Sequence, residues 1–273
     1  MEIVNEKNSC CIKSGKVVID DVYKTSVYDC GKEKVYGFRK KGDLWEDRNG
    51  RLVELNLGNM CSGYDFELLD GLRVWSSECG YIMGCFSDGS EEGLRLEELL
   101  RDEQNGYMGK KKIRMKNIDK VRKDWNEWNI EWMKFVVWRK CLGNVEFREL
   151  LKSLPEDVVL VEDSTYQSGY GAYVWGCKNL EVKKIKNEVR KEMKKKYGEV
   201  YCKSEVKRMI EEEMKKYRGV GRFEGRNVMG KILMGCKMSL DLGLELDIDY
   251  ELLRSKKVNI LGKVLDFNEP KSC

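Results

Sequence analysis

Apolar residues recur at three- and four-residue steps from Trp125 onward, which is the spacing of one face of an α-helix. Trp128, Trp132 and Val136 continue that face, and Met133 widens it. The pattern therefore predicts a long helix with a broad apolar stripe. We expect the rest of the chain to be organised around this helix and the strand that follows it.

A β-branched run after this helix predicts a buried strand. A short helix is expected over 145–151 and should stop before Pro155, because the residue before a proline avoids the helical conformation. The strand is expected over 157–162, and it ends in Glu162 and Asp163. A buried strand that delivers two carboxylates to a loop can build a functional site. The alternative is that these carboxylates simply end the strand.

Short β-type runs before residue 76 predict several small strands. Two of them lie at 16–20 and 34–38. Asn-Gly within 47–50 and Asp-Gly at 70–71 each predict the turn of a hairpin, because these dipeptides tolerate the positive φ that tight turns need. A pair of serines then predicts the capped start of a helix that contains Glu78.

Residues 87–124 are expected to leave the main body and to become helical. Four leucines predict a short amphipathic helix within 94–100. A basic cluster follows at 110–112 and Arg114, just before the tryptophan-rich helix. Such a cluster is typical of a solvated face.

The charge of the chain changes sharply between residues 178 and 218. This segment holds 15 Lys and Arg against 8 Asp and Glu, so it carries +7 while the rest of the chain carries −3. Two narrow apolar stripes on either side of Gly198 predict a protruding helical hairpin. Its acids are interleaved with its bases, which is typical of a salt-bridged solvated surface. The alternative is a basic arm that contacts the phosphates of DNA or RNA.

Glycines dominate the segment that follows the predicted hairpin. Residues 219–225 are expected to form a hinge, and a helix is expected to begin at Arg226. Glycines beside a helix N-terminus can let backbone N–H groups approach a phosphate, although the segment matches no dinucleotide or P-loop fingerprint. A final strand is expected over 258–267, broken by Gly262.

Composition narrows the chemistry that is available. Of the 273 residues, 41% are hydrophobic and 36% are charged, and none is His. The lack of His excludes His general bases, His-based triads and His-ligated zinc, so acid–base chemistry must use Asp, Glu, Lys, Tyr or Cys. The 11 cysteines include no CxxC pair, and no long apolar run occurs. We expect a soluble cytoplasmic protein with reduced thiols, with no metal, no cofactor and no membrane partner.

Six groups of residues occur in an order that is typical of one family. They are Asn59; Gly71, Trp75, Ser77 and Glu78; Lys110 and Arg114; Trp125, Met133, Lys140 and Asn144; Leu160, Glu162, Trp175 and Gly176; and Gly225, Asn227, Gly230, Lys231, Leu233 and Met234. In this respect the chain resembles the NADAR (NAD and ADP-ribose) superfamily of YbiA-like proteins over about residues 36–234. It departs from the family at Ala172, where an Asp is common, and around Cys85, where a Lys is common. Asp163 could replace the missing carboxylate.

The resemblance implies a mainly helical α+β fold with a small N-terminal β-sheet. A single domain is expected over 1–273, with its core in 36–176 and 219–267. The basic helical insertion at 178–218 lies between two family motifs, and the resemblance does not explain it.

The resemblance also implies an N-glycosidase or ADP-ribosyl hydrolase. Such an enzyme cleaves the bond between ribose C1″ and a nitrogen, here most directly in ADP-ribosylated guanine of nucleic acid or nucleotides. One alternative is an N-glycosidase of phosphoribosylamino-pyrimidine intermediates in riboflavin synthesis. Others are a non-enzymatic ADP-ribose or nucleotide binder, and a nucleic-acid-binding protein that uses only the basic hairpin.

Carboxylates suit this reaction, because it builds positive charge at C1″ and needs a proton for the departing nitrogen. Glu78 is the first catalytic candidate, and its helix N-terminus favours the anion. Glu162 or Asp163 would supply the second group, and a neutral Lys110 could instead attack C1″ to form a Schiff base. The candidates for stacking on the base and for holding phosphate or ribose are Asn59, Trp75, Arg114, Trp175, Gly176, Arg226, Asn227 and Gly230.

Overall fold

Helix α4 (Trp125–Gly143) lies at the centre of the protein. The computed structural model describes residues 4–5, 9–39, 43–198 and 202–267. The predicted indole face is present: the rings of Trp125 and Trp128 pack edge to face at 4.8 Å, and those of Trp128 and Trp132 at 6.0 Å. The buried surface of α4 is wider than the predicted apolar stripe, however. Ile130 and Phe135 on its other sides are buried too, because elements pack around most of it.

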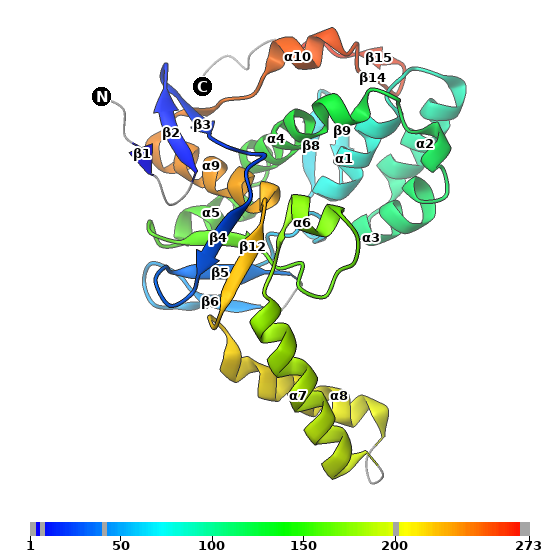
Figure 1. The fold of residues 1–273 in the computed structure, drawn as a ribbon. Helices are drawn as coiled ribbons and strands as arrows, with labels where there is room; N and C mark the ends of the chain where they lie inside the picture. Colours follow the sequence, from blue (N-terminus) through cyan, green and yellow to red (C-terminus); the bar gives the residue numbers. More distant parts are fainter. Residues whose placement is uncertain (1–3, 6–8, 40–42, 199–201, 268–273) are drawn as a thin grey trace.

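Several helices and one β-hairpin cover α4 (Figure 1). The helices are α1 (Ser77–Phe86), α5 (Val145–Ser153), α9 (Val228–Leu242) and α10 (Tyr250–Ser255). The hairpin joins β8 (Phe66–Leu69) to β9 (Leu72–Val74), and Gly71 at its turn has a φ of 76°. The sequence prediction of this hairpin is confirmed. None of the described helices has both the length and the apolar character needed to cross a membrane.

The strands form several small sheets, one of which is built mainly from N-terminal strands, as expected. Their order is β1-β2-β3-β13, β11-β12-β4, β10-β5 and β6-β7. The bounds are β1 (Val4–Asn5), β2 (Cys10–Lys13), β3 (Lys16–Ile19), β4 (Ser26–Asp29), β5 (Val35–Phe38), β6 (Leu44–Glu46), β7 (Leu52–Glu54), β10 (Val159–Glu162), β11 (Cys177–Lys178), β12 (Arg222–Gly225) and β13 (Glu245–Leu246). Early strands pair with late ones, which gives a mixed α+β fold. Residues before 36 also belong to the core, since Val17 and Ile19 are buried in it.

Two predictions for the C-terminal third need correction. The expected hinge at 219–225 contains strand β12, in which Phe223 is buried and Gly225 passes so close to the Gly176 carbonyl that a side chain would not fit. The expected strand over 258–267 is instead a short hairpin of β14 (Asn259–Ile260) and β15 (Lys263–Val264). Its turn holds Gly262 at a φ of 79°. Pairing with the distant strands β4 and β11 forms β12, whereas β14 and β15 pair with each other across a local turn.

The segment between α1 and α4 is helical but irregular. It contains α2 (Glu91–Asp102), the short α3 (Gly106–Met108), a π-helix (Gly109–Arg114) and a 3-10 turn (Ile118–Lys120). The predicted basic cluster lies on the π-helix. Lys111 and Lys112 are exposed as expected, whereas Arg114 turns partly inward. After β10 comes the five-residue helix α6 (Gly171–Trp175).

The predicted helical hairpin projects from the body as an arm (Figure 1). It consists of α7 (Leu180–Tyr197) and α8 (Lys203–Met214), followed by a 3-10 turn (Lys215–Tyr217). Val189, Val206 and Ile210 form a small apolar cluster between the two helices, separate from the main core. Because the arm has its own packing, its outer faces are left to the charged side chains.

Candidate active site

Glu78 lies in the first turn of α1 and is almost entirely buried. The capping signal in the sequence is confirmed: the Ser76 hydroxyl oxygen accepts a hydrogen bond from the Cys79 N–H at 3.2 Å. The backbone N–H of Glu78 donates to the Asn59 carbonyl at 3.0 Å. These two bonds fix the backbone at Glu78 and so orient its side chain. Glu78 is only 6% exposed.

Lys110 and Arg114 of the π-helix approach this carboxyl group. The Lys110 Nζ lies 3.9 Å from Glu78 Oε1, and the Arg114 guanidinium lies 5.9 Å from the centroid of the Tyr81 ring. The close approach depends on Gly106, where a Cβ would come within 3.1 Å of the Glu78 Cβ. The structure therefore brings together three predicted site residues from two separate segments.

Burial raises the pKa of Glu78 above its ordinary value. The charges of Lys110 and Arg114 act in the opposite direction, but desolvation of the carboxylate is the larger effect. The sequence predicted that the helix N-terminus would favour the anion. That expectation needs correction, because the depth at which the side chain is buried was invisible in the sequence and outweighs the helix dipole.

Glu162 joins the same group of charges from the end of β10. Its pKa is raised to about 7, first by burial of the carboxyl group and then by the negative charge of Glu78. Lys110 acts in the opposite sense on the same group. The Oε2 atom of Glu162 is buried without a hydrogen-bond partner among the described residues. Two carboxyl groups and a lysine therefore share one partly dehydrated region.

Asn227 fastens the end of β10 to the start of α9. Its side-chain oxygen accepts the Glu162 N–H at 3.1 Å, and its side-chain nitrogen donates to the Leu160 carbonyl at 2.8 Å. The residue is completely buried and adopts a left-handed φ of 52°. The sequence suggested Asn227 as a ligand-binding residue, but its amide group is already occupied. Its role in this structure is to position Glu162.

Gly230 and Gly176 allow neighbouring segments to pack closely against the end of β10. A Cβ at Gly230 would collide with the Leu160 carbonyl, and one at Gly176 would collide with the Glu162 carbonyl. Both glycines were expected to approach a ligand. In the structure they allow α9 and β11 to approach β10 instead, which places the Glu162 backbone between two close neighbours.

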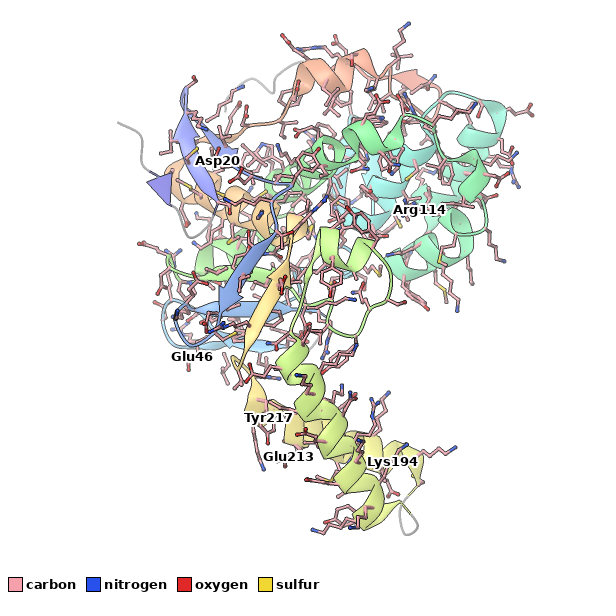
Figure 2. The ribbon with its side chains drawn as sticks, in the orientation of Figure 1. Asp20, Glu46, Arg114, Lys194, Glu213 and Tyr217 are labelled. Carbon is pink, nitrogen blue, oxygen red and sulfur yellow. The ribbon has the colours of Figure 1, made fainter. Side chains whose placement is uncertain are left out.

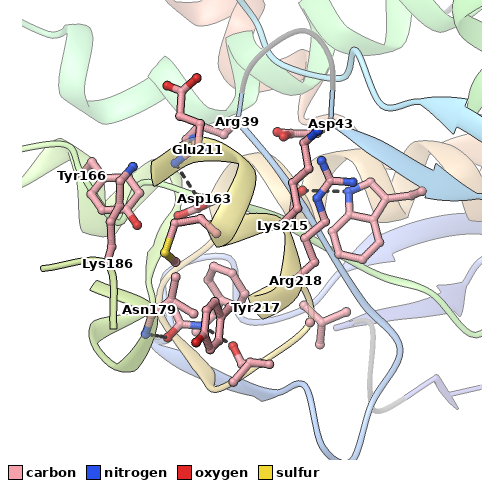
Figure 3. Close-up of a pocket in the computed structure, with 18 residues that line it drawn as sticks. Arg39, Asp43, Asp163, Tyr166, Asn179, Lys186, Glu211, Lys215, Tyr217 and Arg218 are labelled. Carbon is pink, nitrogen blue, oxygen red and sulfur yellow. Dashed lines mark hydrogen bonds and ion pairs between the residues drawn. The ribbon is translucent and has the colours of Figure 1, made fainter. Parts of the chain in front are cut away.

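Asp163 belongs to a different site. Successive residues of a strand point to opposite faces, and Asp163 turns toward the base of the arm, where its Oδ2 lies 3.9 Å from Arg39 Nη1. Its Oδ1 also accepts the Thr165 N–H at 2.9 Å. There it lines a cavity of about 290 Å³, which we call the junction cavity (Figure 3). Asp163 therefore does not stand in for a carboxylate at Ala172, which is itself buried in α6.

The remaining candidates differ in how accessible they are. Trp75 is 38% exposed and directly precedes the cap of α1. Trp175 is half-buried and packs edge to face on Tyr81 at 5.3 Å. Arg226 is half-buried, with its guanidinium 5.7 Å from the centroid of the Tyr170 ring. Asn59 Nδ2 lies 3.7 Å from the Met133 sulfur, and its Oδ1 is buried without a partner in the described part of the chain.

Sequence reasoning missed Tyr81 as a component of this region. Its ring contacts the rings of Trp125 and Trp175 and the Arg114 guanidinium, so it packs beside one of the charged groups of the site. One signal was available: Tyr81 follows Glu78 by three residues and must share its helix face. Searches against known protein families and against curated proteins find no match to this chain. The resemblance to the NADAR superfamily stays a prediction that depends on the spaced motifs.

Proposed function

We propose that the protein is an N-glycosidase that hydrolyses a ribose–nitrogen bond, with ADP-ribose on a guanine base as its substrate class. The observation that carries this proposal is the meeting of Glu78 and Glu162. They come from α1 and β10, both have raised pKa values, and the negative charge of Glu78 contributes to the raised pKa of Glu162. Paired carboxyl groups with unequal environments are the usual means of glycosidic cleavage.

Glu162 is the acid in this proposal. A carboxyl group with a pKa of about 7 is substantially protonated at neutral pH and can donate that proton to the departing nitrogen. Glu78 is the base, because Lys110 and Arg114 favour its charged form relative to burial alone. The C1″–nitrogen bond breaks and its electron pair leaves with the nitrogen. Water adds to C1″ and gives its proton to Glu78.

Lys110 supports Glu78 in this scheme and does not attack the sugar. Its nearest charged partner is the Glu78 carboxylate at 3.9 Å, and its side chain is 40% exposed. A lysine nucleophile requires desolvation or a cationic neighbour. Lys111, the next residue of the basic cluster, lies over the Tyr107 ring, 5.7 Å from its centroid. The arrangement therefore favours an ion pair over a Schiff base.

Trp75 is the stacking surface that fits a purine in this proposal. Its indole is exposed three positions before Glu78, whereas Trp175 already contacts Tyr81. In this proposal a base stacked on Trp75 brings its ribose toward Lys110, whose side chain is 40% exposed. Aromatic rings bind bases in this way at a modest entropic cost.

The test is a comparison of three substrates by mass spectrometry. The purified protein is incubated separately with ADP-ribosylated guanine DNA, NAD and a phosphoribosylamino-pyrimidine, each in water enriched in ¹⁸O. From the first substrate we expect release of ADP-ribose that carries one ¹⁸O atom at C1″, together with DNA whose guanine is unmodified. Cleavage of only the pyrimidine would keep the mechanism and change the substrate. Binding of ADP-ribose without any cleavage would replace the enzyme by a binding module.

A further inference from the structure

A groove lined by positive charge runs along the projecting arm. Five of its nine lining residues are basic: Lys186, Arg190 and Lys194 of α7, with Lys203 and Lys207 at the other side. Each set follows a four-residue step, which keeps its members on one face of a helix. The groove has a volume of about 590 Å³ and contains one acid, Glu211. We call it the arm groove.

The acids of α7 lie on the other side of the helix. Glu188 and Glu192 each follow a groove cation by two residues, which places them about 200° further round the helix axis. Arg190, Lys194, Lys203 and Lys207 form no ion pair with a residue in the described ranges. Acidic and basic residues that alternate along the sequence of α7 therefore lie on different sides of the helix, which leaves the arm groove strongly positive.

The arm groove leads into the junction cavity, with which it shares Lys186 and Glu211. Tyr166 lines this cavity and is 40% exposed, with the Lys186 Nζ 4.1 Å and the Arg39 guanidinium 5.2 Å from the centroid of its ring (Figure 3). Arg218 lines the same cavity and donates to the Leu44 carbonyl at 3.2 Å, which ties the base of the arm to β6. The inner end of the groove thus offers a partly exposed aromatic ring among four basic side chains, with three acids, Asp43, Asp163 and Glu211, in the same lining.

We infer that the arm groove and junction cavity bind single-stranded nucleic acid. A line of cations follows a phosphate backbone, and an exposed ring flanked by cations accepts an unpaired base. In a duplex the bases are already stacked on one another, so Tyr166 would have nothing to accept. Figure 2 shows Lys194 on the arm and Arg114 in the body, so the outer part of the groove lies away from the carboxyl pair. Binding does not require the proposed glycosidase activity.

The test is fluorescence anisotropy with the full chain and a labelled oligothymidine of about 15 nucleotides. The groove variant combines Arg190→Gln, Lys194→Gln and Lys207→Gln. The control combines Lys184→Gln, Lys191→Gln and Lys195→Gln, which removes the same charge from exposed positions of α7 outside the groove. Circular dichroism melting of both triple variants confirms that the arm remains folded.

We expect the groove variant to bind at least about tenfold more weakly than the wild type at low salt. Its plot of log K against log salt should flatten by about 2, because each neutralised phosphate of a single strand contributes about 0.7. The control should change affinity by less than about threefold. A Tyr166→Ala variant should lose affinity without a change in slope. Equal losses in both triple variants, or tighter binding of a duplex than of the single strand, would overturn the inference.

Discussion

The backbone N–H of Glu162 donates a hydrogen bond to the side-chain oxygen of Asn227 at 3.1 Å. The side-chain nitrogen of Asn227 donates to the Leu160 carbonyl, so the start of α9 is hydrogen-bonded to the end of strand β10, next to Glu162. These partners are more than sixty residues apart in the chain. The position of a proposed catalytic carboxyl group therefore depends on a buried residue that has no free group for a ligand.

Asn227→Ala should destabilise the protein by roughly 2–4 kcal/mol, since it leaves a buried donor and a buried acceptor without partners. The measurement is urea unfolding followed by circular dichroism. Asn227→Gly separates the loss of the two hydrogen bonds from the backbone strain that alanine would add, because glycine tolerates the left-handed φ of 52° but makes neither bond. If the Gly variant were as stable as the wild type, the two hydrogen bonds would contribute nothing.

Glu162→Gln should lower kcat by about 10²- to 10⁴-fold, which is the range for loss of a general acid. The wild-type rate should fall as the pH rises above about 7, because Glu162 then loses the proton that it must donate. The residual rate of the Gln variant should lack this alkaline decrease. A variant that keeps both the rate and the decrease would remove Glu162 from the mechanism.

Glu78→Gln should lower kcat by at least about 10²-fold while leaving the fold intact. The matched control is Glu91→Gln, since Glu91 is also a carboxyl group in the first turn of a helix but is exposed on α2. Steady-state kinetics and thermal melting of both variants provide the comparison. Wild-type turnover in Glu78→Gln would contradict the assignment.

Lys110→Ala should slow turnover more than Lys111→Ala or Lys112→Ala. Only Lys110 lies beside Glu78, whereas its two neighbours are exposed. We expect a loss of about tenfold for Lys110→Ala, the size of one charge-assisted contact, and little change for the other two variants. Borohydride treatment with substrate should label none of the three lysines. Trapping of Lys110 would restore the Schiff-base mechanism.

Lys140 should be a source of instability. It is completely buried, its Nζ lies 4.0 Å from the centroid of the Phe147 ring, and burial lowers its pKa to about 8 from the ordinary 10.5. The unfolded chain keeps this proton to a higher pH than the folded protein does. Stability that depends on Lys140 therefore rises with pH between about 8 and 10.5 and is lowest below that range.

Lys140→Met should accordingly stabilise the protein at pH 7, by up to about 3 kcal/mol. The gain should fade as the pH approaches 10.5, where the wild-type lysine is neutral in both states. Thermal melting of the variant and the wild type across this range measures the difference. Lys123→Met, at an exposed position, is the control. A destabilised Met variant at pH 7 would show that the aromatic rings hold the ammonium group favourably.

Local patterns were sufficient for the elements that depend on local chemistry. The tryptophan spacing predicted α4, Asp-Gly predicted the β8–β9 turn, and the serines predicted the cap of α1. These signals operate within one or two turns of chain. The segments 219–225 and 258–267 were predicted wrongly, because pairing with β4, β11 and neighbouring backbone decides their structure.

The candidate site followed the same division. Glu78, Lys110 and Glu162 could be chosen from the sequence, but only the fold shows that Lys110 reaches Glu78, that the charge of Glu78 acts on Glu162, and that Asp163 pairs with Arg39. Strand alternation required that the two neighbouring carboxylates separate, without saying which faces the site. Burial at Glu78 could not be read from a serine-capped helix start, and it reversed the expected direction of the pKa shift.

In the proposed mechanism Glu78 and Glu162 act as one coupled site. The most direct test is a ¹³C NMR titration of the glutamate carboxyl carbons in the wild type and in Glu78→Gln, with the Glu162 signal assigned by its loss in Glu162→Gln. We expect a Glu162 pKa of about 7 in the wild type and a lower value in Glu78→Gln, because the neighbouring negative charge is gone. A Glu162 pKa near the ordinary 4.5 that does not respond to the Glu78 substitution would contradict it.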